Sequence, residues 1–104
     1  MIEQTEEMNA LLDAYEPLLT DKQKDIMNLY FKEDFSLSEI SESLLISRAA
    51  VNDHLKRSEK ILADYEKKLH LVKNYETRSK IYDKIKTIGN EDIRLLIEEL
   101  ENIE

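Results

Sequence analysis

Apolar residues recur at helical spacing along almost the whole chain of 104 residues. Steps of three and four residues place side chains on one face of an α-helix, whereas strict alternation would indicate a strand. The pattern predicts helices at about 3–16, 20–32, 36–44, 47–70 or beyond, and 91–102, with a further helical stripe over 81–88. We therefore expect an all-α chain, and a sheet of three or more strands would contradict this.

Local signals indicate where these helices begin. The stretches Thr20–Gln23 and Ser36–Glu39 have the spacing of a capping box, in which two side chains satisfy free backbone amides at a helix start. Ser47 and Asn90 are suitable N-caps for two later helices. Three separate starts are thus predicted between residues 20 and 47.

Fewer local signals in the sequence indicate where the helices end. Pro17 ends the first helix near Tyr15 or Glu16, because proline removes a helical hydrogen bond. Gly89 suits a helix C-terminus. The sequence leaves open whether one helix spans 47–86 or a break falls near 70–74.

Composition supports a helical protein and excludes other classes. The chain has one Gly, one Pro and no Cys, so many tight turns, disulfides and thiolate metal sites are excluded. No apolar run approaches the ~20 residues of a membrane span. The acidic N-terminus does not resemble a signal peptide, and we expect a soluble cytoplasmic protein.

Charge is distributed unevenly around a net value of −8. Residues 1–34 carry a net −6, residues 35–57 are neutral, residues 58–86 carry +3 and residues 87–104 carry −5. An acidic protein binds DNA only through a local basic patch, because duplex binding requires cations that replace counterions. Any such patch is expected in the middle of the chain.

The stretch 36–57 has the pattern of a helix-turn-helix unit: a short helix, a tight turn and a longer helix. The inward positions are Ile40, Leu44, Ile46, Val51 and Leu55. The outward positions of the second helix are Ala49, Asp53, Lys56 and Lys60, flanked by Asn52 and Arg57, with Arg48 at the helix start. In a recognition helix, Asn can read adenine, and Arg can read guanine or hold a phosphate.

A helical bundle with ordinary solvated charges explains the same pattern, and the pattern alone does not separate the two. Leu45 occupies the turn, where many such units have Gly for a positive φ. Leu45 must therefore accept strain or form a different turn.

The combination of several short motifs resembles the YlxM family, small helix-turn-helix proteins of Gram-positive bacteria, over about residues 8–82. The motifs that carry the resemblance are Leu19–Gln23, Leu29–Phe31, Ser36–Glu42, Ile46–Val51, Lys56–Lys60 and Asp64–Leu69. Their centre also resembles region four of bacterial sigma factors. The resemblance implies a sigma-four-like bundle, a regulatory DNA-binding role, a link to the signal recognition particle GTPases, and no catalysis.

By position, the resemblance implies a DNA-facing set of Ser47, Arg48, Ala49, Asn52, Asp53, Lys56 and Arg57. Three positions depart from the usual pattern. Ser41 replaces an Ala, Leu45 replaces a Gly or other turn former, and Ala49 replaces a Gln able to read bases. These departures leave the fold intact and weaken base-specific reading. A module that binds a protein and has kept the fold is therefore the rival prediction.

Other candidate chemistry is sparse. His54 and His70 lie sixteen residues apart, too far to share a metal on one helix, and His54 is expected to be a packing residue. The sequence contains no catalytic triad order and no glycine-rich phosphate loop, and we expect no catalytic, cofactor or metal site.

The chain is expected to form one all-α domain over residues 1–104, with the helix-turn-helix at about 36–60 and a helical extension at about 70–104. The apolar stripe between Leu55 and Ile88 exceeds what a thin helical protein can cover. Surplus apolar surface of this kind usually marks an interface. We expect a homodimer formed by the long helix and the C-terminal tail, which would provide two recognition helices for a paired site. An intramolecular hairpin that covers the stripe is the alternative.

Overall fold

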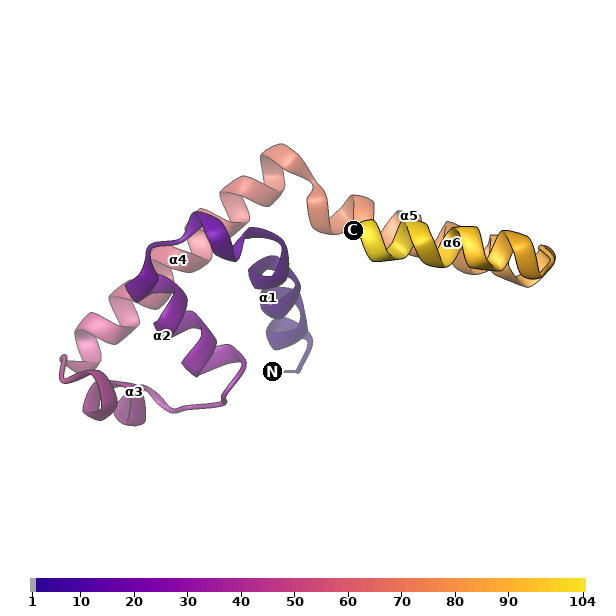
Figure 1. Ribbon diagram of the computed structural model, residues 1–104. Coiled ribbons are helices and arrows are strands. Elements are labelled where there is room, and N and C mark those ends of the chain that lie inside the picture. The colour runs from indigo at the N-terminus through magenta and orange to yellow at the C-terminus, as the bar shows by residue number, and fades with distance from the viewer. Residues whose placement is uncertain (1) are drawn as a thin grey trace. The chain divides into compact units, whose positions relative to one another are not determined.

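The computed structural model describes residues 2–104, and their side chains from Thr5 onward. The elements are α1 (Ile2–Tyr15), the short 3₁₀ turn η1 (Glu16–Leu18), α2 (Asp21–Phe31), α3 (Leu37–Leu44), α4 (Arg48–Leu69), α5 (Leu71–Ile88) and α6 (Glu91–Ile103) (Figure 1). No strand occurs within 2–104. The predicted all-α class is confirmed.

The helix starts are fixed by the side chains that the sequence indicated. The hydroxyl of Thr20 accepts from the amide of Gln23, whose own side chain accepts from the amide of Thr20. Ser36 and Glu39 make the same reciprocal pair at the start of α3. Ser47 caps α4 by accepting from a backbone amide. The backbone of each capping residue is extended, which is the usual conformation of an N-cap. Each of these helix starts is therefore determined by residues that are close in the sequence.

The open question about residues 47–86 is resolved at His70, where the long helix breaks. His70 adopts a left-handed conformation with φ 55°, and its amide donates to the carbonyl of Glu66 at 2.9 Å. A left-handed residue ends an α-helix because it turns the chain away from the helical axis. α4 therefore ends at Leu69, and α5 begins at Leu71.

The chain divides into two compact units, residues 1–70 and residues 71–104. In the first unit, α1, α2 and α3 all pack against α4. Its buried apolar side chains are Leu12, Tyr15, Leu19, Ile26, Met27, Phe31, Ile40, Val51, Leu55 and Leu62. The predicted single folded domain over 1–104 stays a prediction.

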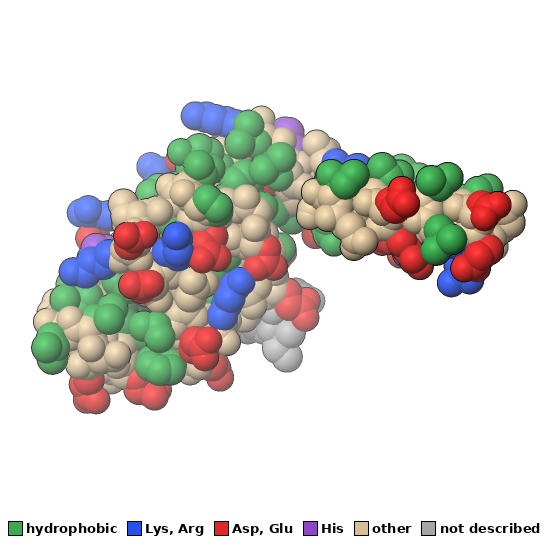
Figure 2. Space-filling view, in the orientation of Figure 1, with side chains coloured by type: hydrophobic (Ala, Val, Ile, Leu, Met, Phe, Trp, Pro, Cys, Tyr) green, Lys and Arg blue, Asp and Glu red, His purple; other side chains and the backbone are tan. Residues whose placement is uncertain are grey.

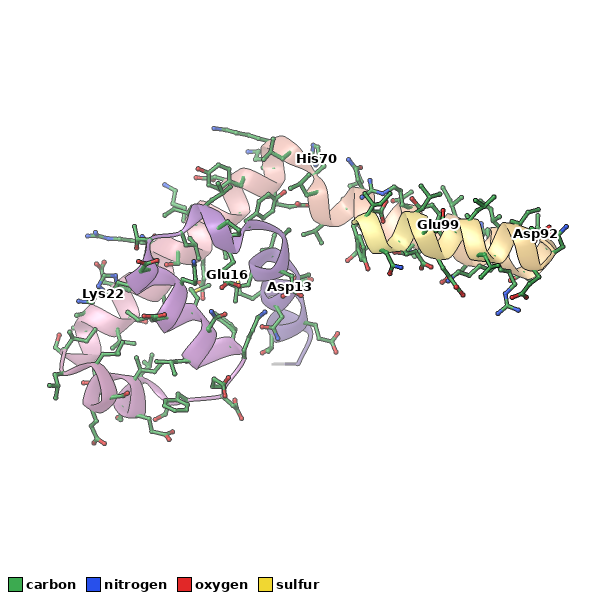
Figure 3. All side chains as sticks on the ribbon, in the orientation of Figure 1. Asp13, Glu16, Lys22, His70, Asp92 and Glu99 are labelled. Atoms are coloured by element: carbon green, nitrogen blue, oxygen red, sulfur yellow. The ribbon has the colours of Figure 1, made fainter. Side chains whose placement is uncertain are left out.

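Tyr15 joins the first and fourth helices of this unit. Its side chain is fully buried, its ring stacks on Tyr65 at 6.0 Å, and its hydroxyl donates to Glu66 at 2.6 Å. A second link to α1 is an ion pair of 2.6 Å between Lys32 and Asp13. Figure 3 labels Asp13. These contacts hold α1 against the scaffold that presents α3 and α4.

The second unit is an antiparallel hairpin of α5 and α6. Gly89 permits the tight connection, because a Cβ at this position would lie 2.6 Å from the side chain of Ile93. Asn90 caps α6, as predicted. Ion pairs of 2.6 Å join Arg78 to Glu104 and Lys86 to Glu101. The tail thus folds back on α5, as the hairpin alternative required.

Within the described chain, no helix combines the length and the apolar character needed to cross a membrane.

Candidate nucleic-acid interface

The helix-turn-helix arrangement is built from α3, the turn at 45–47 and α4. Ile40 from α3 and Val51 and Leu55 from α4 are buried, and α3 packs directly on α4. Their burial directs the opposite side of α4 outward. The predicted short helix, turn and longer helix are confirmed.

Leu45 forms the turn by accepting backbone strain. Its φ of 57° and ψ of 44° are left-handed, and its side chain is 90% exposed. Left-handed geometry costs a non-glycine residue about 1–2 kcal/mol, because Cβ approaches the next carbonyl. An exposed leucine gains almost no burial energy in return. Of the two outcomes that the sequence left open, the structure therefore shows strain.

Ser41 stabilises this turn, a role that the sequence analysis missed. Its hydroxyl donates to the carbonyl of Ile46 at 2.5 Å, and its own carbonyl accepts from the amides of Leu45 and Ile46. The residue that departs from the usual Ala thus joins the last turn of α3 to the residue before the cap of α4. A hydroxyl four residues before the unusual turn residue Leu45 was the available signal.

The seven predicted DNA-facing residues all lie at the N-terminal half of α4 or at its cap. The exposed members are Ser47, Arg48, Ala49, Asp53, Lys56 and Arg57, whereas Asn52 is half-buried. A single helix and its cap bring them together. Their contact with DNA stays a prediction.

The electrostatics of this face are mixed. Arg57 Nε lies 3.0 Å from Asp53 Oδ2, one helical turn earlier, and both side chains are exposed. The carboxylate orients the guanidinium and offsets its charge. Figure 2 shows both basic and acidic side chains on the visible side of this unit.

Three lysines continue the face along α4. Lys56, Lys60 and Lys67 are exposed and lie four and seven residues apart, which aligns them on one side of a helix. Ala49 and Ala63 fall on the same line and are exposed. At a rise of 1.5 Å per residue, the lysines extend over about 16 Å. Lys56 and Lys60 were predicted from the sequence, whereas Lys67 was not, although its spacing was the available signal.

Two titratable residues border this face. Burial raises the pKa of the Glu59 carboxyl, and the nearby charge of Lys56 partly opposes this shift. His54 is half-buried, so its packing role is partial.

No cluster of His, Asp or Glu among the described side chains is arranged to hold a metal ion.

Comparison with known proteins identifies the family. The model of the UPF0122 family, described as "Putative helix-turn-helix protein, YlxM / p13 like", matches residues 2–103. A UPF0122 protein of Streptococcus suis is 50% identical over 94 residues, which cover 90% of this chain and 83% of that protein. A UPF0122 protein of Streptococcus pneumoniae is 54% identical over 84 residues, which cover 81% of this chain and 76% of that protein. The α3–turn–α4 unit and these matches together show that the chain belongs to the UPF0122 family of YlxM-like helix-turn-helix proteins.

Proposed function

We propose that this chain is a regulatory protein of the cytoplasm that binds duplex DNA through the exposed side of α4. The observation that carries the proposal is the orientation of this helix. Val51 and Leu55 are buried against the rest of the unit, while Arg48, Lys56 and Arg57 are exposed. A helix held in this way can enter a major groove with its first turns.

The arrangement favours phosphate contact over fine base reading. The exposed Ala49 methyl allows close approach and can contact a thymine methyl. The exposed ion pair with Asp53 orients the guanidinium of Arg57 and offsets part of its charge, so the lysines carry more of the phosphate contact. The aligned lysines Lys56 and Lys60 can bind successive backbone phosphates.

Fluorescence anisotropy with labelled duplex fragments at several salt concentrations tests this proposal. Arg48→Ala and Arg57→Ala should each weaken binding by about 1–3 kcal/mol where the arginine contacts a base. Where it contacts a phosphate, the loss should be uniform across sequences, and the slope of log affinity against log salt should fall by about one. Lys22→Ala, an exposed change on α2 (labelled in Figure 3), is the control and should bind as the wild type does. Equal affinity of the Arg48, Arg57 double variant and the wild type would refute DNA binding by this face.

A second candidate function is docking on a protein, with GTPases of the signal recognition particle as the partner class. One observation favours it: Leu45 keeps an almost fully exposed apolar side chain in a conformation that suits glycine. A contact made by this side chain would explain why a leucine occupies the turn. The exposed acids Glu39 and Glu42 on α3 would face a basic partner.

Capture of partners with and without nuclease distinguishes the two functions. Partners that bind through DNA should disappear after nuclease treatment, and a protein that docks directly should remain. Capture by Leu45→Gly gives the control, because this change removes the docking side chain and leaves the exposed charges of α4 intact. Equal capture of the same protein by Leu45→Gly and the wild type would refute docking through the turn.

A further inference from the structure

The hairpin of α5 and α6 buries very little of its own apolar surface. Among its described residues, only Ile97 is buried, and α5 contributes no buried residue. Several large aliphatic side chains remain exposed to solvent, with Ile88 85% exposed and Ile103 82% exposed. Apolar surface gathered in this way marks a docking surface.

Most of the large exposed aliphatic residues of α5 and α6 lie on one side of the hairpin. Tyr82 donates to Glu104 and Ile97 is buried, so Tyr82 and Ile97 mark the sides of α5 and α6 that face each other. Ile81 and Leu96 each precede these residues by one position, which rotates each side chain by about 100° around the axis of its own helix. Because the two helices are antiparallel, the same rotation places both residues on the same side of the hairpin. Steps of three and four residues extend this side into an apolar face: Ile81, Ile85, Ile88, Ile93, Leu96, Leu100 and Ile103.

The opposite side of the hairpin is polar. Asp83 and Glu98 follow the facing residues by one position, so they are turned the other way and are exposed. Leu95 is the one large aliphatic residue of α6 on this side, and it is 50% exposed. The hairpin is thus amphipathic as a unit, which is the pattern of one half of a four-helix bundle.

Charge along the two helices indicates what covers the apolar face. α5 carries five basic and two acidic residues, and α6 carries one basic and five acidic residues. At the outer borders of the apolar face lie Lys84 on α5 and Glu99 on α6, both exposed, and the second is labelled in Figure 3. In Figure 2, hydrophobic and acidic side chains both lie over α6. The face therefore has a basic border and an acidic border.

A second copy of the same hairpin matches both borders. If a two-fold axis runs along the hairpin, α5 of each copy lies against α6 of the other, and Lys84 lies across from the partner's Glu99. The contacts Arg78–Glu104 and Gly89–Ile93 put residues 84 and 99 at the same level along the hairpin. A two-fold axis perpendicular to the helices would instead place the basic α5 of one copy against the basic α5 of the other, where like charges repel.

We propose that the apolar face of the α5–α6 hairpin binds the same face of a second copy, with α5 of each copy against α6 of the other. The two hairpins form a four-helix bundle whose core is the seven aliphatic residues of the apolar face. The two Lys84–Glu99 pairs at its borders select this arrangement. The inference rests on the hairpin alone and does not depend on DNA binding.

Sedimentation equilibrium of the full chain from 1 to 100 µM tests the proposal. Leu96→Glu should weaken the dimer by at least about 100-fold, because the two-fold axis buries two unpaired carboxylates. Leu95→Glu is the matched control, since the neighbouring leucine has similar exposure on the polar side, and it should remain dimeric. A wild-type chain that stays at the 12.3 kDa monomer mass would overturn the proposal. So would equal effects of the two leucine variants.

A charge exchange tests the arrangement without altering the apolar face. Lys84→Glu and Glu99→Lys should each weaken the dimer by roughly 2- to 30-fold at low salt, because each removes two border pairs. The double variant restores both pairs with reversed sign and should recover wild-type association. Glu76→Lys, an exposed change on the polar side of α5, is the control and should have no effect. A double variant weaker than either single variant would overturn the arrangement. Circular dichroism confirms that each variant stays helical.

Discussion

Replacing Leu45 by glycine should stabilise the first unit, although glycine usually destabilises folded proteins. Leu45 has φ 57°, where a Cβ costs about 1–2 kcal/mol. Glycine removes this strain and adds about 0.5–1 kcal/mol of backbone entropy to the unfolded chain. The side chain is 90% exposed, so its removal costs almost no packing. The balance is a gain of about 0.5–1 kcal/mol in the free energy of unfolding.

Thermal unfolding followed by circular dichroism at 222 nm measures this gain. For a domain of this size, the expected rise in Tm is about 2–6 °C. Leu45→Ala is the matched control: it also removes the exposed side chain but keeps the Cβ, so it should show no such rise. If the glycine variant melts at or below the Tm of the alanine variant, strain at this turn is refuted.

Two further stability predictions concern polar side chains of α3 and α4, the hydroxyl of Ser41 and the carboxyl of Glu59. Ser41→Ala should lower the free energy of unfolding by about 1 kcal/mol in urea denaturation, because it removes the hydrogen bond to Ile46; unchanged stability would show that this bond contributes nothing. Glu59→Gln should raise the Tm at pH 7, because burial raises the pKa of Glu59 in the folded state and its charged form is therefore disfavoured there. The advantage should vanish as the pH falls below the unfolded pKa of about 4.3, where the carboxyl is protonated in both states. Melting curves between pH 3 and pH 7 decide this, and an advantage that grows at low pH would contradict it.

The sequence determined the starts of α2, α3, α4 and α6, because each is set by side chains within three residues of the backbone amides that they cap. Local hydrogen bonds of this kind do not depend on the rest of the fold. The end of α1 at Tyr15 is also a local effect, because Pro17 has no backbone N–H to donate to a helical hydrogen bond. The outward side of α4 was also predicted from the sequence, because Val51 and Leu55 have the spacing of one helix face. Both side chains are buried in the structure.

Other features required the tertiary structure. The break at His70 has no glycine or proline to mark it, and a left-handed residue there is strained rather than favoured. The ion pair of Arg57 with Asp53 had a recognisable spacing, but only the side-chain geometry shows that it forms. The hydrogen bond from Ser41 to Ile46 depends on the path of a turn that the sequence left open.

From the sequence, the apolar stripe between Leu55 and Ile88 was expected to exceed what a thin helical protein can cover, and a hairpin and a dimer were left as alternatives. The structure shows that α6 folds back on α5 and still leaves the apolar face open. Helical periodicity determines which side chains share a face of one helix. Whether the faces of two helices lie on the same side of a pair depends on their direction and on which residues meet, and these are properties of packing that only the tertiary structure decides.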